Sequence, residues 1–318
     1  VYKRQDMGLT LDNLLTEARN PQTMELDSMT PLEIVTAMNR EDARVPESIR
    51  PQLPNIAQCV AWATEAIRSG GRLIYMGAGT SGRLGVLDAV ECPPTFGVSP
   101  DVVVGLIAGG EGAFVKAVEG AEDSRELGKA DLEAIGLTPK DLVVGIAASG
   151  RTPYVLGGLA YANSLGCKTA AISCNPGSAL GKEARLAIEV APGPECLTGS
   201  TRLKAGTAQK LILNMISTAT MVGCGKAYSN LMVDVMQTNE KLVVRAQNIV
   251  MEATGVSRDS AKEAIAQYRM ESEMQKAERI QRRQERRQEL EQLFENLKSE
   301  MDGRVLGQGR LMKAFPQM

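Results

Sequence analysis

The sequence predicts a doubly wound α/β fold, in which a five-stranded parallel sheet lies between two layers of helices, over about residues 55–195. Two observations predict this fold. Short runs of the chain are continuously apolar, which is typical of strands buried on both faces. Most intervals between these runs are long enough for a crossover helix, and such connections join parallel strands. The apolar runs are 73–76, 102–107, 142–147, 169–172 and 186–190.

The segments before the sheet are more polar. Residues 1–6 precede Met7 and show no folding pattern, so we expect a non-native leader. Residues 7–54 read as an N-terminal arm with one helix that opens at Thr30-Pro31. From Ile56 to Ile67 apolar residues recur at helical spacing, and Gly70-Gly71 ends that helix.

The main domain is expected to extend over residues 55–225 and to be followed by a helical region, 226–267. Long helices are predicted over 205–222 and 231–252. Residues 268–318 are rich in Glu, Gln and Arg, and we expect a charged tail that is helical or disordered. The i,i+4 pair Glu278 and Arg282 would support an exposed helix there.

Composition limits the chemistry. The chain has 318 residues with 36 Lys and Arg against 38 Asp and Glu, so its net charge of −2 gives no general field for nucleic acid or a membrane. No apolar run approaches the ~20 residues that span a bilayer. The absence of histidine excludes histidine triads, histidine bases and the commonest transition-metal ligand. The 6 cysteines are scattered singly, which indicates reduced thiols in a cytoplasm.

A glycine loop, Gly77 to Gly85, follows the first predicted strand. It fits the dinucleotide pattern G-x-G-x-x-G, but Asp101 lies at the wrong end of the second strand for a ribose contact, although Glu111 keeps that interpretation open. The loop lacks the lysine and hydroxyl of a Walker motif. Two hydroxyls, Thr80 and Ser81, at a helix N-terminus instead suit a phosphate monoester.

A second such loop, Ser149-Gly150-Arg151-Thr152, follows the third strand. Two loops at the carboxyl ends of neighbouring strands form a shared crevice, so we expect a small phosphorylated ligand there. The alternative is that these hydroxyls only cap helices. A nucleophilic role for Ser81 or Ser149 is disfavoured because the chain has no histidine to activate it.

Acidic side chains are expected beside this crevice. Glu91 precedes Pro93-Pro94, where the helix should end, near the crevice mouth. Glu119, Glu122 and Asp123 follow the second strand at the same edge. Single acids are usually solvated surface. In a chain without histidine, however, carboxylates are the natural acid–base pair for a sugar-phosphate-sized ligand.

These residues also resemble a known family, the N-acetylmuramic acid 6-phosphate etherases of the sugar isomerase (SIS) fold. The similarity extends from about Leu15 to Gln267, after which relatives continue as a small helical unit whereas this chain becomes charged and Gln-rich. The matching segments are 77–85, 88–95, 117–123, 148–154, 173–176 and 198–210.

The resemblance implies a lyase of cell-wall recycling that cleaves the D-lactyl ether at C3 of the sugar, giving N-acetylglucosamine 6-phosphate. It implies Glu91 as general acid and Glu122 as general base, with no metal or organic cofactor. Arg202 and Lys204 would approach the sugar from the neighbouring subunit of a homodimer, or else be solvated cations at a helix start. The implied phosphate-binding residues are Thr80, Ser81, Gly82, Ser149, Gly150, Arg151 and Thr152.

Two other functions stay open on this resemblance. Relatives of the fold such as the glucokinase regulatory protein bind sugar phosphates without turnover. Sugar-phosphate isomerases share the fold and also use a glutamate base, but they release nothing. The presence of both Glu91 and Glu122 favours the etherase.

Overall fold

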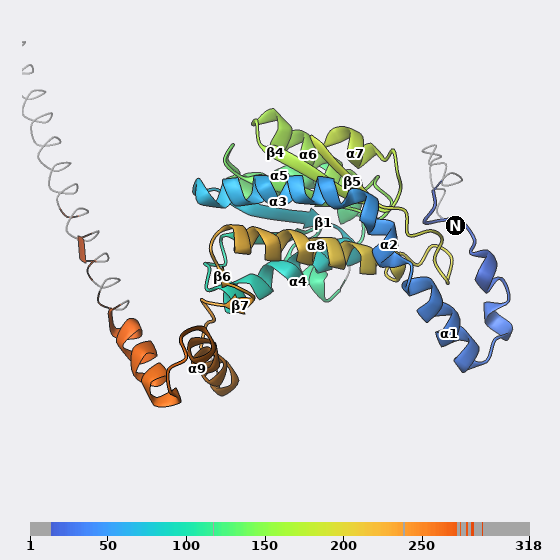
Figure 1. Ribbon diagram of the computed structural model, residues 1–318. Coiled ribbons are helices and arrows are strands. Elements are labelled where there is room, and N and C mark those ends of the chain that lie inside the picture. The colour runs from blue at the N-terminus through green and yellow to red at the C-terminus, as the bar shows by residue number, and fades with distance from the viewer. Residues whose placement is uncertain are drawn as a thin grey trace, which may run out of the picture. The chain divides into compact units, whose positions relative to one another are not determined.

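The computed structural model describes residues 14–116, 118–237 and 239–271, with single residues to 288. Contacts divide the chain into one unit that ends at Val243 and another that begins at Val244. The first unit contains the predicted five-stranded parallel sheet, in the order β2-β1-β3-β4-β5 (Figure 1). The strands are β1 (Leu73–Gly77), β2 (Val103–Ile107), β3 (Leu142–Ile146), β4 (Lys168–Ser173) and β5 (Leu186–Glu189).

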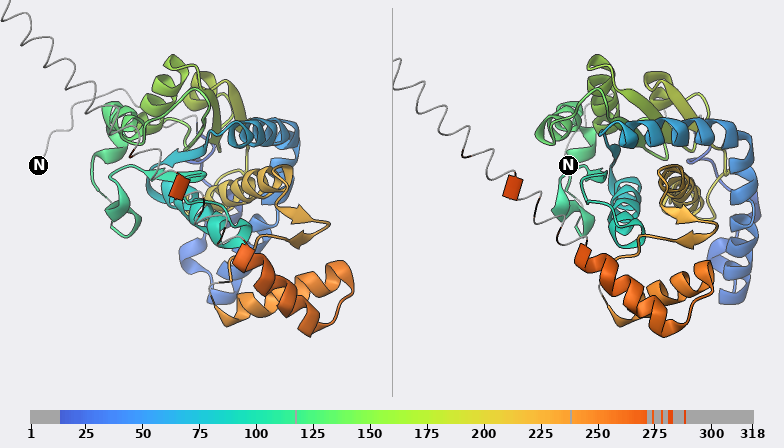
Figure 2. Two further views of the ribbon diagram at one scale, coloured as in Figure 1. Left: turned by 90° about the vertical axis from the view of Figure 1, so that its left-hand side faces the viewer. Right: turned by 60° about the vertical axis from the view of Figure 1, so that its left-hand side comes forward.

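Helices cover both faces of this sheet, as predicted. Successive strand residues point to opposite faces, so Tyr75 packs with one helical layer while Ile74 and Met76 pack with the other. One layer contains α2 (Val45–Ile49), α3 (Leu53–Arg68), α4 (Gly79–Phe96) and α8 (Lys204–Gly223). The opposite layer contains α5 (Arg125–Ala134), α6 (Pro153–Ser164) and α7 (Ala179–Glu183). Figure 2 shows the layers from two further directions.

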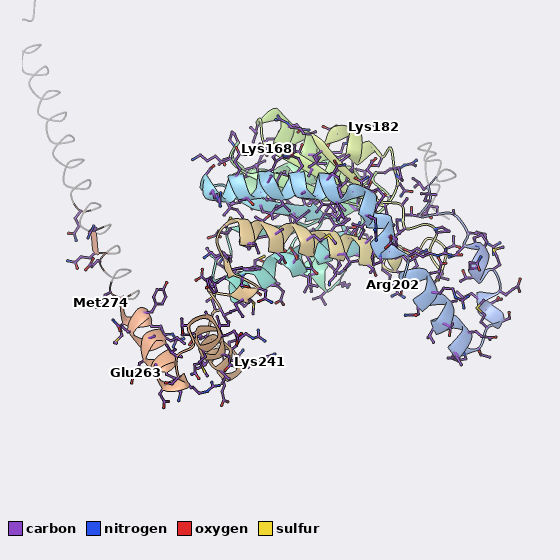
Figure 3. The ribbon with its side chains drawn as sticks, in the orientation of Figure 1. Lys168, Lys182, Arg202, Lys241, Glu263 and Met274 are labelled. Carbon is purple, nitrogen blue, oxygen red and sulfur yellow. The ribbon has the colours of Figure 1, made fainter. Side chains whose placement is uncertain are left out.

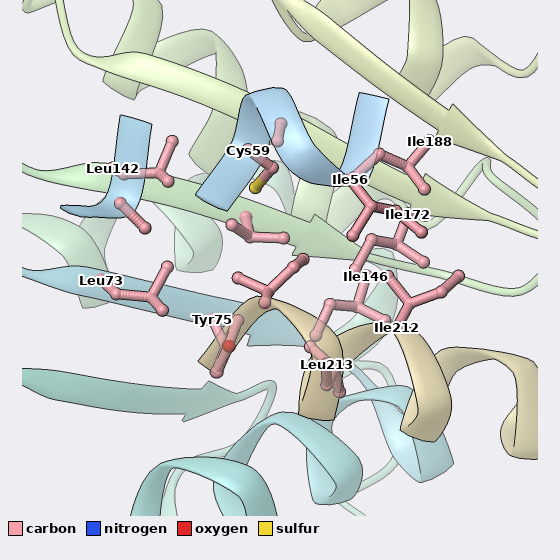
Figure 4. Close-up of a cluster of buried hydrophobic side chains, with 14 of the residues drawn as sticks. Ile56, Cys59, Leu73, Tyr75, Leu142, Ile146, Ile172, Ile188, Ile212 and Leu213 are labelled. Carbon is pink, nitrogen blue, oxygen red and sulfur yellow. The ribbon is translucent and has the colours of Figure 1, made fainter. Parts of the chain in front are cut away.

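The core on the α3 and α8 side is built of apolar residues from the sheet and from the helices that cover this face, and Figure 4 shows part of it. Leu73, Leu142 and Ile172 come from the sheet, and Ile56 and Ile212 from the helices above it. All five are at most 4% exposed. Burial of each such side chain stabilises the fold by roughly 1.5–3 kcal/mol, which fixes α3 and α8 on the sheet.

The N-terminal arm is anchored to the sheet domain. Helix α1 (Pro31–Asp42) begins where predicted, because Thr30 and Glu33 form a reciprocal capping box. Thr23 Oγ1 donates to the Cys196 carbonyl at 2.8 Å, so the arm is joined to the segment after β5. The shorter 3-10 turns are Pro21–Thr23, Leu26–Ser28, Arg50–Gln52, Glu111–Phe114 and Ala121–Asp123.

Two predicted helix boundaries are wrong. Helix α4 does not end before Pro93-Pro94; it runs through both prolines to Phe96 and stops at Gly97, whose φ is 62°. Prolines in a last turn remove few helical hydrogen bonds, and the left-handed glycine supplies the stop. The helix expected over 231–252 begins only at Glu240, as α9 (Glu240–Thr254). The hairpin β6 (Ala227–Tyr228) and β7 (Leu231–Met232) precedes it.

Residues 258–271 are helical, in keeping with the helical region expected after the sheet domain. Within the expected tail, the ion pair between Glu278 and Arg282 is present at 3.6 Å. The leader 1–6 and most of the tail lie outside the described residues. No helix in the described part of the chain has the length and apolar character that crossing a membrane requires.

Candidate functional site

The first glycine loop joins β1 to α4 through a very close backbone approach. A Cβ on Gly82 would lie 2.6 Å from the Gly77 carbonyl oxygen, so a larger residue cannot occupy position 82. Gly79 has a φ of 52°, which glycine adopts without strain. The turn therefore exposes backbone N–H groups at the start of an 18-residue helix, where an anion is favoured.

The hydroxyls of this loop differ in their surroundings. Ser81 is buried, and its Oγ donates to Gln209 Oε1 on α8 at 3.0 Å. Thr80 is half-buried, and its hydroxyl has no hydrogen-bond partner among the described residues. The Gln209 amide nitrogen is also buried without a partner in the described chain. Sequence reasoning gave Gln209 no role, although it lies in one of the segments that match the family.

The second glycine loop, like the first, contains a glycine that no larger residue can replace. A Cβ on Gly150 would lie 2.3 Å from Ser178 Cβ, and the φ of Gly150 is 68°, so glycine is required. The Arg151 N–H donates to Ser149 Oγ at 3.3 Å. Thr152 is the N-cap residue of α6, but its side chain makes no capping hydrogen bond. The alternative that these hydroxyls merely cap helices therefore fails for Thr152.

The two loops meet at a reversal of the chain topology. β1 pairs with β2 on one side and with β3 on the other, both in parallel. The loops after β1 and β3 consequently leave the same edge of the sheet in opposite directions, and a crevice is expected at such a point. Ligands of open parallel sheets bind at such a point. The two loops therefore follow neighbouring strands, as predicted. The shared crevice stays a prediction, because the hollows beside the two loops have no lining residue in common within the described residues.

A hollow of ≈ 410 Å³ beside the first loop contains the acidic cluster. Gly79 and Arg83 line it together with Glu119, Glu122 and Asp123. The Arg83 guanidinium donates to the carbonyls of Phe114 at 2.6 Å and Ala113 at 2.9 Å. These bonds fix the loop after β2 against α4, so the structure brings Glu122 to the first glycine loop.

A second hollow, of ≈ 600 Å³, lies beside the Ser149 loop. Ser149 and Arg151 line it with Lys182 from α7 and Leu14 from the arm. Asn175 fixes this region, because its Nδ2 donates to Thr16 Oγ1 at 3.1 Å and to the Ala148 carbonyl at 3.0 Å. The arm and the β4 loop thus hold the second glycine loop in place.

Glu91 and Glu122 line different hollows of the folded chain. It is exposed on α4 and lines a separate hollow with Asp88 of the same helix and Lys210 of α8. Glu91 lies 12 residues after Gly79 on α4, about 18 Å along the helix axis. The expectation that Glu91 lies at the crevice mouth stays a prediction, since in this chain Glu91 lines a hollow separate from that of Glu122.

Asp88, one turn before Glu91, is buried. Its Oδ1 accepts from Asn214 Nδ2 at 2.7 Å and from Ser217 Oγ at 3.1 Å. Burial raises the pKa of Asp88, and the hydrogen bonds from Asn214 and Ser217 oppose that rise. Burial, with Asp88 and Glu91 nearby, also raises the pKa of the Cys92 thiol to about 12. That thiol is protonated at neutral pH and is no nucleophile.

Lys204 and Arg202 occupy different environments. Lys204 is 1% exposed, and its Nζ lies 2.6 Å from Glu41 Oε2. The backbone N–H groups of Lys204 and Ala205 donate to the Glu195 carboxylate, each at 2.9 Å. The alternative that both residues are solvated cations is thus wrong for Lys204. Arg202 is exposed near the N-terminal end of α8, as Figure 3 shows.

Within the described residues, no group of three or more Asp, Glu or Cys side chains has the arrangement of a metal site. All 6 cysteines are free, and Cys224 alone among them is more than marginally exposed.

The fold and the paired loops define a protein of the SIS class. An SIS domain model matches residues 130–219, and a model of the glucokinase regulatory protein N-terminal SIS domain matches residues 55–163. The structure of a phosphoheptose isomerase from Francisella tularensis aligns with 61% of this chain and 100% of its own, at 18% identity and a TM-score of 0.49.

Relatives at much higher identity define the family. The N-acetylmuramic acid 6-phosphate etherase of Cronobacter sakazakii is 62% identical over 259 residues, which are 81% of this chain and 87% of that protein. The etherase of Serratia proteamaculans is 63% identical over the same shares. The chain belongs to the N-acetylmuramic acid 6-phosphate etherase family, as its motifs indicated.

Proposed function

We propose that this protein cleaves the D-lactyl ether of N-acetylmuramic acid 6-phosphate, giving N-acetylglucosamine 6-phosphate and D-lactate in the recycling of cell-wall amino sugars. The observation that carries the proposal is the acidic cluster with Glu122 beside the first glycine loop, at the reversal of the sheet, in a chain 62% identical to proteins named for this activity.

The 6-phosphate is assigned to the two loops. Backbone N–H groups of Gly82 and Gly150 and the side chains of Thr80, Ser81, Ser149, Arg151 and Thr152 are the proposed donors. The free hydroxyls of Thr80 and Thr152 among the described residues support this, as do the N-termini of α4 and α6. Each hydrogen bond to a charged phosphate is worth roughly 1.5–3 kcal/mol.

The proposed chemistry is a series of proton transfers. Opening of the sugar ring gives an aldehyde at C1, which acidifies the proton at C2. The Glu122 carboxylate removes that proton, and the C3–O bond breaks as Glu91 donates a proton to the departing lactyl oxygen. Water then adds to C3 of the unsaturated aldehyde. The net change is hydrolysis of the ether, so no oxidant, reductant or metal is consumed.

Four further assignments accompany the reaction. We propose a homodimer in the cytoplasm, and the free cysteines, mostly buried, suit a reducing compartment. Arg202, being exposed, is the proposed further contact to the sugar. The Lys204 ammonium is committed to Glu41, so its proposed role is to hold the start of α8 in position.

The test is the release of D-lactate from N-acetylmuramic acid 6-phosphate by the purified chain. Glu122→Ala and Glu91→Ala should each reduce kcat by at least about a hundredfold, which is typical of a lost general acid or base. Glu119→Ala is the matched control, because Glu119 lines the same hollow as Glu122 without an assigned role. Full release by both glutamate variants would refute these roles.

A sugar-phosphate sensor is the second candidate, favoured by the match to the glucokinase regulatory protein domain over residues 55–163. A sensor would bind N-acetylmuramic acid 6-phosphate without releasing lactate. Calorimetric binding of the substrate beside the lactate assay therefore separates the two functions.

A further inference from the structure

We propose that Arg83 is the positioning residue of the proposed general base, Glu122. The inference rests on the proposed function and deepens it. Arg83 lies near the start of α4, and its guanidinium holds the loop after β2, Gly109 to Asp123, which carries Glu122. Arg83 acts on the reaction through that loop and not by touching the sugar phosphate.

The loop after β2 depends on contacts outside the sheet for its position. β2 lies at the edge of the sheet beside β1, so the loop leaves the sheet with strand support on one side. Gly109, where the loop begins, has a φ of 92°, and Gly120, just before Glu122, has a φ of 76°. Glycine restricts the backbone less than any other residue, so these positions do little to fix the loop.

Arg83 supplies the hydrogen bonds that join this loop to a helix. Its Nε donates to the Phe114 carbonyl at 2.6 Å, and its Nη2 donates to the Ala113 carbonyl at 2.9 Å. Within the described residues, the other hydrogen bonds of the loop stay inside it or reach Ile107, at the end of β2. A guanidinium presents its N–H donors in a rigid planar fork, so two bonds to successive carbonyls fix both the position and the direction of the turn.

The loop closes on itself, so the hold on Ala113 reaches the acidic residues. The Gly109 backbone is in close contact with Ala113 and Val118, since a Cβ on Gly109 would lie 3.3 Å and 2.7 Å from their Cβ atoms. Ala121, which is 8% exposed, anchors the far end of the loop in the core. Glu122 follows directly, so its carboxylate is placed by a compact loop that is held at both ends.

Arg83 does not act as a counter-charge for the acidic cluster. It shares a hollow with Glu119, Glu122 and Asp123, yet in the described part of the chain it forms an ion pair with none of them. A guanidinium beside three carboxylates has such partners at hand, but these donors go to backbone carbonyls. The loop is therefore held through its backbone, and the Glu122 carboxylate is left for the substrate.

Arg83 itself starts from a fixed backbone. The residue before it, Gly82, lies against Gly77 of β1, and Ser81 Oγ bonds to Gln209 Oε1 on α8 at 3.0 Å. The proposed phosphate loop and the loop of the base thus share one support, the start of α4. A substrate held by its 6-phosphate there would meet the base at a set distance and angle, as proton removal requires.

Arg83→Met tests the proposal, because methionine keeps an apolar stem and a high helix propensity but has no donor. We expect kcat for D-lactate release to fall at least about tenfold while KM changes little, because a displaced base loses its alignment with C2. Arg125→Met is the matched control. Arg125 follows the same loop and is exposed, and its side chain has no hydrogen bond or ion pair in the described chain. This variant should leave kcat and KM unchanged.

Three further readouts separate positioning from a general structural role. In the Glu122→Gln background, Arg83→Met should cost no additional activity, because Arg83 acts through Glu122. Amide hydrogen exchange of residues 109–123 should be faster in Arg83→Met than in the wild type, with exchange of the sheet unchanged. Arg83→Lys keeps the charge but not the fork, so its kcat should lie between those of the wild type and Arg83→Met.

Four results would overturn the proposal. A raised KM at unchanged kcat would make Arg83 a contact to the sugar phosphate. An equal loss of kcat with and without Glu122 would mean that Arg83 acts independently. Full activity of Arg83→Lys would show that charge alone suffices, and unchanged exchange of the loop would show that these bonds do not hold it. A wild-type chain that releases no lactate would instead refute the proposed function, and the role of Arg83 with it.

Discussion

Single residues at the end of the sheet away from the glycine loops hold the central strands together. Arg72 precedes β1 and Asp141 precedes β3, and their side chains pair at 2.8 Å. Asp141 also accepts from the Arg72 and Thr138 backbone N–H groups, each at 2.8 Å. Because the carboxylate is 2% exposed, its charge depends on these partners.

Asp141→Asn should therefore destabilise the protein by about 3 kcal/mol at pH 7, since it leaves the half-buried Arg72 without its counter-charge. Burial alone would raise the pKa of Asp141. The contacts with Arg72 and Thr138 outweigh burial, so the pKa of Asp141 lies below its ordinary value. This lowered pKa stabilises the fold at pH values above about 3.9, the pKa of Asp in the unfolded chain. The stabilisation is lost as the pH falls through the pKa of Asp141 in the folded protein.

Urea unfolding of wild type and Asp141→Asn at several pH values measures this. The difference in unfolding free energy should be largest near neutrality and shrink below about pH 4. Asp101→Asn, at an exposed acid just before β2, is the control and should change stability little. A difference that stays constant down to low pH would contradict the assignment.

Ser81 and Gln209 give a prediction about the phosphate loop. Ser81→Ala should raise KM for the sugar phosphate at least about tenfold, because a hydrogen bond to a charged group is lost. Gln209 contacts Ser81 rather than the hollow, so Gln209→Met should also raise KM. If Gln209 acts through Ser81, the double variant should be no worse than Ser81→Ala. Additive effects on KM in this double-mutant cycle would show that Gln209 acts independently.

At the scale of elements, the sheet and its main helices are predictable because burial on both faces leaves a continuous apolar signal. β3 is 0% exposed at Leu142, Val143, Val144 and Ile146, and those residues are all apolar in the sequence. The hairpin β6–β7 gives no such signal. Its strands have only two residues each, too few to leave an apolar pattern, so the sequence does not separate them from the start of α9. An ion pair of 2.7 Å between Lys226 and Asp234 helps to hold the hairpin.

Close packing between α5 and α6 leads to an element-scale prediction. A Cβ on Gly128 would lie 1.9 Å from the Tyr154 carbonyl oxygen, which belongs to the backbone of α6. Gly128→Ala should therefore push the two helices apart and cost about 3 kcal/mol. Gly112→Ala is the matched control, because nothing lies within 4 Å of its Cβ and its φ is not in the left-handed region. Equal melting temperatures for the two variants would contradict this packing.

At the scale of the molecule, the sequence identifies the loops of the site but not how they assemble. The glycine patterns at 77–85 and 149–152 imply a phosphate site, because only glycine permits those turns. No pattern predicts that Lys204 is buried against Glu41, which precedes it by 163 residues. Nor does a pattern predict that Glu91 and Glu122 line separate hollows, because that depends on how the loop after β2 packs against α4.

The last prediction concerns the pair of chains as a functional unit. Val90→Asp puts a charge on the exposed face of α4, so folding should be unaffected while association of two copies is disfavoured. Sedimentation should show a shift to single chains, and D-lactate release should fall with it, because the proposed active unit is the homodimer. Ala160→Asp, at an exposed position of α6 in the other helical layer, is the control and should leave both mass and rate unchanged. A Val90→Asp chain that sediments as a monomer yet releases lactate at the wild-type rate would mean that one chain contains a complete site.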